Sequence, residues 1–455
     1  MNGATSSPTA RLGRFVADTA RAPLRGDVAR KAAICLLDAL GLALLAHEEP
    51  TVAAMRDLVT PLSGPGGGAR LWGGSRWAVL SEAVATNATA VHALFQDDND
   101  VPSWSHPASL VTPVALCCGD STDAPVAEVL RALAVGYGAI AWLGADERVA
   151  RALIRRGIRT SPTLGIIAAA ATAAAMVGLD AGRATSAVGI AASLAGGVLE
   201  PVGCGSDEWR VQNAQAARGG LLAAQLAARD VQGAAQALEG PKGLMRSLAG
   251  LEAVPEWERA PSVDTLLDVW AKPWATLGDN VPAVAAAHAL RSAGVPLDRV
   301  ERIRARIWRP YAEYPGTSWR GPFDTVAQAL ASTAFGIAAM LRFGRLDYGV
   351  CVRHREDPAI AHLVARMAIE PHDGQWHEAS IEAVLVDGTT LRRTCADGPR
   401  RLMFQDQATA IELFEQRTRT SGRPSGVGAK FAASIFAAVD GTASPTVRSL
   451  LDRLS

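Results

Sequence analysis

Residues 92–110 read HALFQDDNDVPSWSHPASL and lie between two apolar, alanine-rich segments, 83–94 and 110–118. Pro102 and Pro107 cannot lie inside a regular helix, so the polar residues of this stretch are expected on a loop that joins two buried helices. Those residues are Asp97, Asp98, Asn99, Asp100 and His106. A loop that carries carboxylates and a histidine between rigid helices is a suitable place for acid–base catalysis.

A calcium-binding or solvated acidic turn is the alternative interpretation of this loop. The stretch lacks the glycine and the distal glutamate of an EF-hand loop, which argues against calcium. The solvated turn stays open as an alternative on this stretch alone.

The composition favours a mainly helical protein with two domains. The chain has 455 residues, more than one ordinary core accommodates. Hydrophobic residues make up 49% and aromatic residues only 5%, and the apolar part is mostly alanine, leucine and valine. Such a composition is typical of tightly packed helices and not of a β-sandwich.

The charge balance and the cysteines exclude some classes of partner and location. The 45 basic and 45 acidic residues cancel, so no electrostatic footprint for nucleic acid or an anionic membrane is present. The six cysteines are scattered without CxxC spacing, as expected for buried free thiols in a reducing compartment. The first fifteen residues have no apolar signal-peptide core, and the apolar run 163–179 is interpreted as a core helix. We expect a cytoplasmic protein with no membrane partner.

The order of the expected elements divides the chain into two domains. Helices are expected over 11–21, 26–46, 125–144, 162–178, 184–198 and 213–228, with a short extended piece at 71–74. After about residue 265 the pattern predicts a strand at 300–308, helices at 324–343 and 358–368, and a hairpin of 379–386 and 389–395 around Asp387-Gly388. Residues 408–454 return to helix. The prediction is a discontinuous helical domain, 1–266 with 409–455, and a smaller α/β domain, 267–408.

Three further polar clusters interrupt the alanine background. RRGIRTSP, 155–162, precedes an apolar helix, where free backbone N–H groups, hydroxyls and arginine suit a carboxylate or phosphate. There we favour Arg159 and Thr160 as site residues and a solvated role for Arg155 and Arg156.

The second cluster, SDEWRVQN at 206–213, offers Arg210 or Asn213 as an anion ligand or helix cap, and Trp209 as a pocket wall or packing residue. The third, AKPWATLGDN at 271–280, joins the two domains, where ligand sites are frequent, so Lys272 is also a candidate.

Motifs for cofactors and metals are missing. The chain has no P-loop, no GxGxxG after a strand, no HExxH and no GxSxG. His354, His362, His372 and His377 lack metal-ligand spacing and are interpreted as surface or satisfied core residues. Asp38, on an apolar helix face, is interpreted as a paired core carboxylate. We expect no cofactor and no metal.

The order of these motifs resembles the MmgE/PrpD family, which includes 2-methylcitrate dehydratase, cis-aconitate decarboxylase and iminodisuccinate epimerase. The resemblance covers nearly the whole chain. It rests on LLDALG at 36–41, HALFQDDND and SHPAS within 92–109, RGIRTSPTLG at 156–165, GLDAGRATSAVGIAASLAGG at 178–197, AARGGLLAAQLAARDVQG at 216–233, LEGPKGL at 238–244, KPWAT at 272–276 and KF at 430–431.

The resemblance implies a large helical domain, a smaller α/β domain, a homodimer and no cofactor. It places the site between the domains and implies a small di- or tricarboxylate substrate that undergoes elimination, decarboxylation or epimerisation. Carried over by motif, His106 matches the family's histidine before proline, Lys272 its lysine at the domain junction, and Asp97 and Asp98 its aspartate pair.

Several usual positions of the family differ in this chain. Phe95 replaces an aspartate, Arg159 a histidine, Trp209 a lysine and Phe335 a tyrosine, and the histidine expected after the KPYP-like motif is absent from LGDNV. The leading hypothesis is a cofactor-independent lyase or isomerase. His106 would move the proton, Asp97 or Asp98 would orient it or act as a second acid–base group, and Lys272 would serve as a catalytic cation.

The substrate-binding candidates are Arg159, Arg210, Asn99, Trp209, Phe335 and Thr160. The alternatives are a family member that binds without catalysis, and a biosynthetic enzyme that catalyses cyclisation or C–C bond formation.

Overall fold

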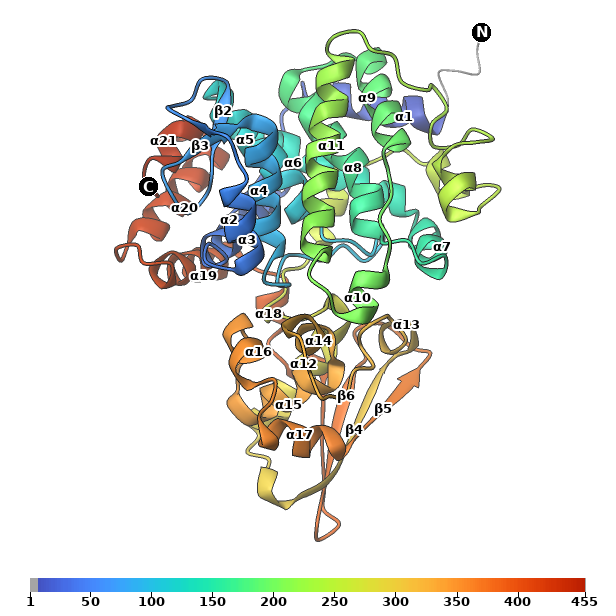
Figure 1. Ribbon diagram of the computed structural model, residues 1–455, viewed down its shortest axis with the longest axis vertical. Coiled ribbons are helices and arrows are strands. Elements are labelled where there is room, and N and C mark those ends of the chain that lie inside the picture. Colours follow the sequence, from blue (N-terminus) through green and yellow to red (C-terminus); the bar gives the residue numbers. More distant parts are fainter. Residues whose placement is uncertain (1–6, 455) are drawn as a thin grey trace.

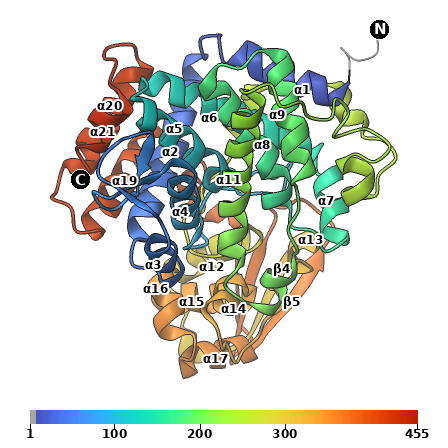
Figure 2. The same ribbon diagram turned by 45° about the horizontal axis from the view of Figure 1, so that its top comes forward.

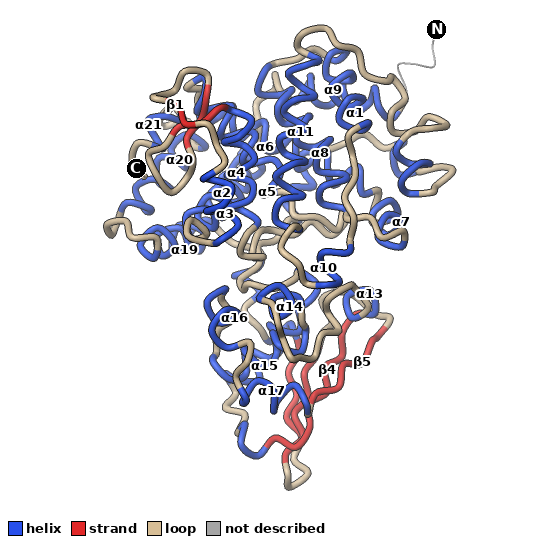
Figure 3. The backbone as a smooth tube through the Cα atoms, in the orientation of Figure 1, coloured by secondary structure: helices blue, strands red, loops and turns tan. Residues whose placement is uncertain are grey.

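The computed structural model describes residues 7–454 as a large helical domain and a smaller domain of helices and a four-stranded sheet. Figure 1 shows the helical domain above the smaller one, and Figure 3 shows the main sheet confined to the smaller domain. The predicted mainly α fold with a smaller α/β domain is confirmed. Two separate apolar clusters of buried side chains accompany this division, one for each body.

Both ends of the chain contribute to the helical domain. Figure 1 shows the C-terminal helices beside α2–α5, and α19 packs against α2. The N-terminal helices are α1 Pro8–Thr19, α2 Gly26–Leu45, α3 Pro50–Asp57, α4 Leu80–His92, α5 Ala108–Thr122, α6 Val126–Gly144, α7 Arg148–Arg155, α8 Thr160–Val177, α9 Ala181–Ser193, α10 Glu200–Cys204 and α11 Trp209–Ala227. The C-terminal ones are α19 Gln407–Thr420, α20 Val427–Val439 and α21 Val447–Leu451.

Helix α8 lies at the centre of the helical domain, packed by α5, α6 and α11 (Figure 2). It begins after the extended residue Arg159 and ends at Gly178, whose left-handed φ of +74° suits a helix C-cap. The helices α6 and α8 are both long and apolar enough to cross a membrane, but 83% of each apolar window is buried inside the protein. Burial on all sides is what a core helix requires.

The smaller domain is built on a sheet of strand order β5-β4-β6-β7. Its strands are β4 Val300–Trp308, β5 Met367–His372, β6 Ser380–Leu385 and β7 Thr390–Thr394, and its helices are α12 Val281–Ser292, α13 Arg309–Ala312, α14 Val326–Ala331, α15 Thr333–Phe343, α16 Tyr348–His354, α17 Pro358–Ala365 and α18 Arg400–Met403. The predicted strand 300–308 and the hairpin around Asp387-Gly388 are confirmed.

Some local predictions are wrong. Strand β5 was expected as the end of a helix, but it pairs in parallel with β4, a partner far away in sequence. The helix expected over 324–343 is interrupted at Ser332, whose extended backbone ends α14 and whose hydroxyl accepts the backbone N–H of Phe335 at the start of α15. The extended piece at 71–74 is a turn between β2 Gly68–Arg70 and β3 Trp77–Val79, where Gly73 has a φ of +93°. β3 also pairs with β1 Pro61–Leu62.

Candidate active site

The loop between α4 and α5 carries the candidate catalytic residues at the junction of the two domains. Asn99 exchanges backbone hydrogen bonds with Trp270, of 2.8 and 3.2 Å, which ties the loop to the segment that enters the smaller domain. Phe95 and Trp104 both adopt left-handed backbone conformations, with φ of 59° and 48°. The loop also holds Asp100, whose carboxylate accepts the backbone N–H of Ser103 at 3.0 Å and closes the turn.

His92, the last residue of α4, is fully buried and forms the centre of a hydrogen-bond chain. Its Nε2 lies 2.7 Å from Nη2 of Arg159, and because a guanidinium can only donate, this nitrogen accepts. Its Nδ1–H therefore donates to Oδ2 of Asp97 at 2.7 Å. Burial lowers the pKa of His92 to about 4, so the ring stays neutral and keeps this tautomer near neutral pH.

Asp97 and Lys272 form a buried pair that the protein leaves open. Both side chains have 0% exposure, and Oδ1 of Asp97 lies 3.7 Å from Nζ of Lys272. Neither atom has a hydrogen-bond partner among residues 7–454. Burial alone raises the pKa of the Asp97 carboxyl, but the hydrogen bond from His92 and the charge of Lys272 lower it, and the net shift is downward, so the group is a carboxylate. Burial lowers the pKa of Lys272.

His106 is partly exposed, and its hydrogen bond determines which ring nitrogen carries the lone pair. Its Nδ1–H donates to the backbone carbonyl of Asp98 at 2.8 Å, because that oxygen can only accept. The neutral ring therefore has its lone pair on Nε2, which has no partner in the described part of the chain. Burial and the charge of Lys272 lower the pKa of His106, which keeps this lone pair available. The rings of His92 and His106 lie 5.5 Å apart.

Asp98 contacts His106 through its backbone carbonyl, and its side chain lies in a buried hydrogen-bond network. Its carboxyl accepts the Tyr137 hydroxyl at 2.6 Å and the backbone N–H of Ala108 at 2.9 Å. Burial raises the pKa of Asp98 to about 8, so near neutral pH it is mainly protonated. These contacts fix the residue whose backbone carbonyl accepts from His106, and the role expected for Asp98 stays a prediction.

Arg159 reaches the cluster from the start of α8, but most of its donors have protein acceptors. Besides His92, its Nη1 donates to the carbonyl of Trp209 at 2.6 Å and to Oε1 of Gln212 at 3.0 Å. Within residues 7–454 no carboxylate lies within 4 Å of it, so its positive charge is not neutralised by a salt bridge. With Lys272 charged, the cluster carries one positive charge in excess, which favours an anionic ligand.

Aromatic side chains occupy two of the positions where the resemblance implies polar groups. Trp209 lies edge-on to His92, with ring centroids 4.9 Å apart, and packs against Phe95 at 4.3 Å. Nζ of Lys272 lies over the Phe95 ring, 5.2 Å from its centroid. These rings exclude water around the buried charges.

The other predicted binding residues have structural contacts. Arg210 is 1% exposed, lies over Trp209, and pairs with Asp207 at 2.5 Å and Glu49 at 3.5 Å. The Thr160 hydroxyl donates to the carbonyl of Trp104. Phe335 is buried in the core of the smaller domain, where its ring packs on Phe323 at 5.3 Å. Their roles in substrate binding stay predictions, and the contacts favour positioning.

The sequence analysis did not identify His92 as a site residue. It also missed Asp279 and the tyrosines Tyr311 and Tyr314, all of which belong to the smaller domain. Asp279, after Lys272 in the junction segment, has a buried Oδ1 without a hydrogen-bond partner among residues 7–454, and burial raises its pKa to about 7. Trp104 packs across the junction on Tyr311 and Tyr314, with ring centroids 5.6 and 5.9 Å apart. The position of His92 at the start of the acidic motif was a usable signal, whereas the others depend on how the domains meet.

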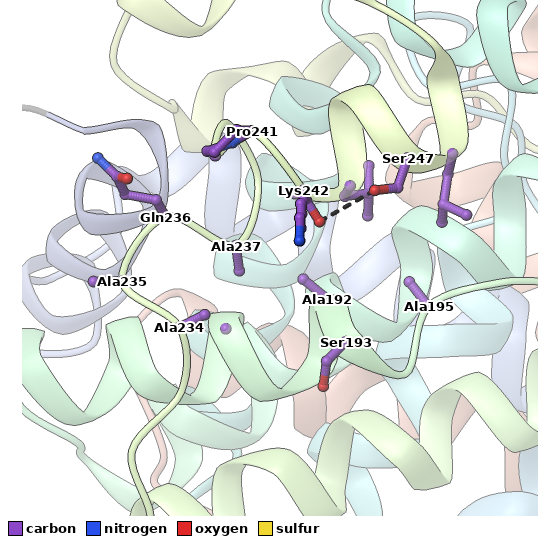
Figure 4. A pocket seen from close by; sticks show the side chains of 15 residues that line it. Ala192, Ser193, Ala195, Ala234, Ala235, Gln236, Ala237, Pro241, Lys242 and Ser247 are labelled. Atoms are coloured by element: carbon purple, nitrogen blue, oxygen red, sulfur yellow. Dashed lines mark hydrogen bonds between the residues drawn. The ribbon is translucent and has the colours of Figure 1, made fainter.

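No group of three or more histidine, cysteine, aspartate or glutamate residues that could hold a metal ion occurs within residues 7–454. A cavity of about 720 Å³ lies elsewhere, between α9 and the segment 234–248 (Figure 4). Its lining is mostly alanine, glycine and leucine, with Lys242 as its charged residue, and it contains none of the predicted site residues. The predicted site residues that the structure brings together, Asp97 and Lys272, lie at the domain junction instead.

Comparison with known proteins places this geometry in a family. The MmgE/PrpD N-terminal domain matches residues 10–256, more than half of the chain. A curated relative, the cis-aconitate decarboxylase-like protein oryM of Aspergillus oryzae, is 25% identical over 417 residues, which covers 81% of this chain and 85% of the relative.

Proposed function

The chain belongs to the MmgE/PrpD family, and on that premise we propose that it is a cofactor-independent lyase or isomerase acting on a small carboxylate between its two domains. The observation that carries this proposal is the open pair of Asp97 and Lys272. Oδ1 of Asp97 and Nζ of Lys272 are buried, lie 3.7 Å apart and have no hydrogen-bond partner within residues 7–454. A buried charged group without a partner is costly unless something completes its contacts. A substrate carboxylate that accepts from Nζ of Lys272 does this.

The proposed reaction begins with proton transfer to His106. Nε2 of His106 takes the proton next to the substrate carboxylate, so the C–H bond breaks and its electron pair moves onto the carboxylate oxygens. Lys272, with Arg159 behind it, stabilises the negative charge that develops there. A hydroxyl group on the neighbouring carbon, protonated by the imidazolium of His106 as it leaves as water, then gives elimination. Protonation of the opposite face by a water molecule, with His106 giving its proton back to solvent, gives epimerisation. In a decarboxylation, the same histidine in its protonated form supplies the proton that replaces carbon dioxide.

Asp97 has a supporting role in this scheme. The Arg159–His92–Asp97 chain fixes Oδ1 of Asp97 toward Lys272, which favours the charged ammonium form of that lysine. A carboxylate whose pKa is lowered is a weak base, so we assign the proton transfer to His106.

The test follows exchange of a substrate proton with solvent deuterium. Small di- and tricarboxylates, cis-aconitate among them, are incubated with the protein in D₂O and followed by proton NMR. We expect deuterium incorporation into at least one of them, reduced about 10²–10⁴-fold in the His106→Asn variant. Exchange at the wild-type rate in His106→Asn would refute the assigned base.

A second candidate is a protein that binds its carboxylate without this chemistry or performs cyclisation or C–C bond formation. The observation that favours it is the substitution of usual acid–base positions by Phe95, Trp209 and Phe335, all buried. Thermal stabilisation by a carboxylate without deuterium exchange or product would support the binding protein. A new product without exchange would support the altered reaction.

We also propose that the protein is a homodimer in the cytoplasm, associated through the outer face of α11. Leu222 on α11 is 47% exposed, and Leu194 and Val198, on the neighbouring segment that leads to α10, are 52% and 62% exposed. The Gln212 amide donates to the carbonyl of Val198 and joins the two parts of this face. An exposed apolar face of this kind suits a second copy of the same surface.

Sedimentation velocity at micromolar concentration tests the dimer. We expect a dimer for the wild type, a monomer for Leu222→Glu, and a dimer for the control Val352→Glu, because Val352 is also exposed but lies on α16. A wild-type monomer, or a dimer that tolerates Leu222→Glu, would contradict this interface.

A further inference from the structure

A second cavity, of about 570 Å³, lies at the domain junction where α16 of the smaller domain faces α19 of the helical domain. Figure 1 shows these helices on the same side of the junction. None of the side chains of His92, Asp97, His106 and Lys272 lines this cavity. It is therefore separate from the catalytic cluster, although it lies between the same two domains.

The cavity brings together positive charges from both domains. Arg345 and Arg353 line it from the smaller domain and Arg417 from α19, whereas Asp347 is its one lining carboxylate. Arg345 is 3.8 Å from that carboxylate. In the described part of the chain, residues 7–454, no carboxylate lies within 4 Å of Arg353.

Two of these arginines are placed to receive a ligand. The guanidinium of Arg353 lies against Gly349, where an added Cβ would be 2.8 Å from both of its terminal nitrogens, so the glycine allows the side chain to lie flat on α16. Arg417 is only 6% exposed and uses Nη1 for Asp38. Its Nε and Nη2 have no partner within residues 7–454.

We propose that this cavity is a binding site for a small dianion with carboxylate or phosphate groups, held by Arg353 and Arg417 from opposite domains. The planar guanidinium matches both groups with two parallel hydrogen bonds. A volume of about 570 Å³ is in the usual range for a small-molecule site. The positive lining and the single carboxylate exclude a cationic ligand.

Two residues that line this cavity are next in sequence to residues of the catalytic cluster, and they couple binding in the cavity to that cluster. The lining residue Gln96 precedes Asp97, and the lining residue Pro273 follows Lys272. The Gln96 amide donates to the carbonyl of Pro273 at 3.0 Å and holds the two segments together. An anion bound by both Arg353 and Arg417 holds the two domains in one relative position next to the Gln96–Pro273 hydrogen bond. It thereby also fixes the distance between Asp97 and Lys272. This coupling, but not the binding itself, rests on the proposed function.

Calorimetric titration with inorganic phosphate, at constant ionic strength, tests the site. The variants are Arg353→Ala, the matched control Arg342→Ala, and Lys272→Met, which alters the catalytic cluster. Arg342 is exposed on α15 and does not line the cavity. We expect roughly tenfold weaker binding in Arg353→Ala, because a charge-assisted contact is lost, and unchanged binding in the other two.

The same titration with succinate distinguishes a phosphate from a dicarboxylate as the ligand. The anion that binds with the lower Kd shows which of the two chemical groups the site prefers. Amide hydrogen exchange should slow in residues 345–353 when either anion saturates the wild type, and remain unchanged in Arg353→Ala. The proposal is overturned if neither anion gives saturable binding, or if the affinity is the same in Arg353→Ala as in the wild type. Loss of binding in Lys272→Met with Arg353→Ala unaffected would place the anion in the catalytic cluster instead.

Discussion

Two buried ion pairs, each formed by residues far apart in sequence, differ in how completely they are satisfied. Where α19 meets α2, Nη1 of Arg417 lies 2.8 Å from Oδ1 of Asp38 and 3.0 Å from the Asp38 carbonyl. At the domain junction, Nζ of Lys272 lies 3.7 Å from Oδ1 of Asp97 and donates to nothing among residues 7–454. In the first pair the two side chains hydrogen-bond to each other directly, and we call it the closed pair, although Oδ2 of Asp38 has no partner among residues 7–454. It fastens a C-terminal helix to the domain. The second pair is open, because the two atoms that face each other have no hydrogen-bond partner among residues 7–454. A site that binds a ligand needs such free donors and acceptors.

The largest effect is expected when the closed pair is broken. Arg417→Met leaves the carboxylate of Asp38, 5% exposed, without its cation. The free energy of unfolding, measured by urea denaturation, should fall by about 3–5 kcal/mol. The double variant Asp38→Asn with Arg417→Met should recover most of this loss, because no buried charge then lacks a partner. A stability loss in Arg417→Met no larger than in Lys272→Met would remove the contrast between the pairs.

Lys272→Met should change binding, and it should lower stability less than Arg417→Met does. The amine has 0% exposure and no hydrogen bond among residues 7–454, and Asp97 retains the N–H of His92, so the variant loses no direct hydrogen bond between the pair. The loss of one charge-assisted contact to an anionic substrate should raise KM roughly 10- to 100-fold. An unchanged KM together with a large loss of stability would indicate that this pair is as structural as the other.

The smallest effect concerns pH and the carboxyl of Asp98. Its pKa in the folded protein, about 8, lies above its ordinary value of 3.8, so folding strengthens proton binding. The stability that the protonated carboxyl provides is complete below about pH 4 and is lost as the pH rises from there toward 8. Asp98→Asn stays neutral and keeps contacts to Tyr137 and Ala108, so it should lack this decline. The check is urea denaturation of both proteins from pH 4 to 9, and parallel curves would contradict the raised pKa.

The sequence predicted the elements and the catalytic loop more fully than it predicted the contacts between them. Pro102, Pro107 and the flanking alanine-rich segments were sufficient to place the acidic loop between α4 and α5, and alternation was sufficient for β4. Strand β5 was missed because its parallel pairing with β4 depends on a partner more than sixty residues away. Local periodicity does not contain that information.

The same limit applies to the site. His106, Asp97 and Lys272 were identified by residue type and motif, and the structure brings Asp97 and Lys272 together from segments on either side of the junction. Arg159 was expected to hold substrate, yet its donors first serve His92, Trp209 and Gln212. Which donors a buried arginine has left depends on the chain that surrounds it, and no spacing rule for a single segment reports that.

The most direct test of the open pair is a crystal structure of the His106→Asn variant with an exchangeable carboxylate trapped in it. The account predicts a substrate carboxylate oxygen about 2.7–2.9 Å from Nζ of Lys272, with the reacting C–H bond directed at residue 106. A carboxylate bound elsewhere at the junction, with Nζ of Lys272 still without a partner, would contradict it.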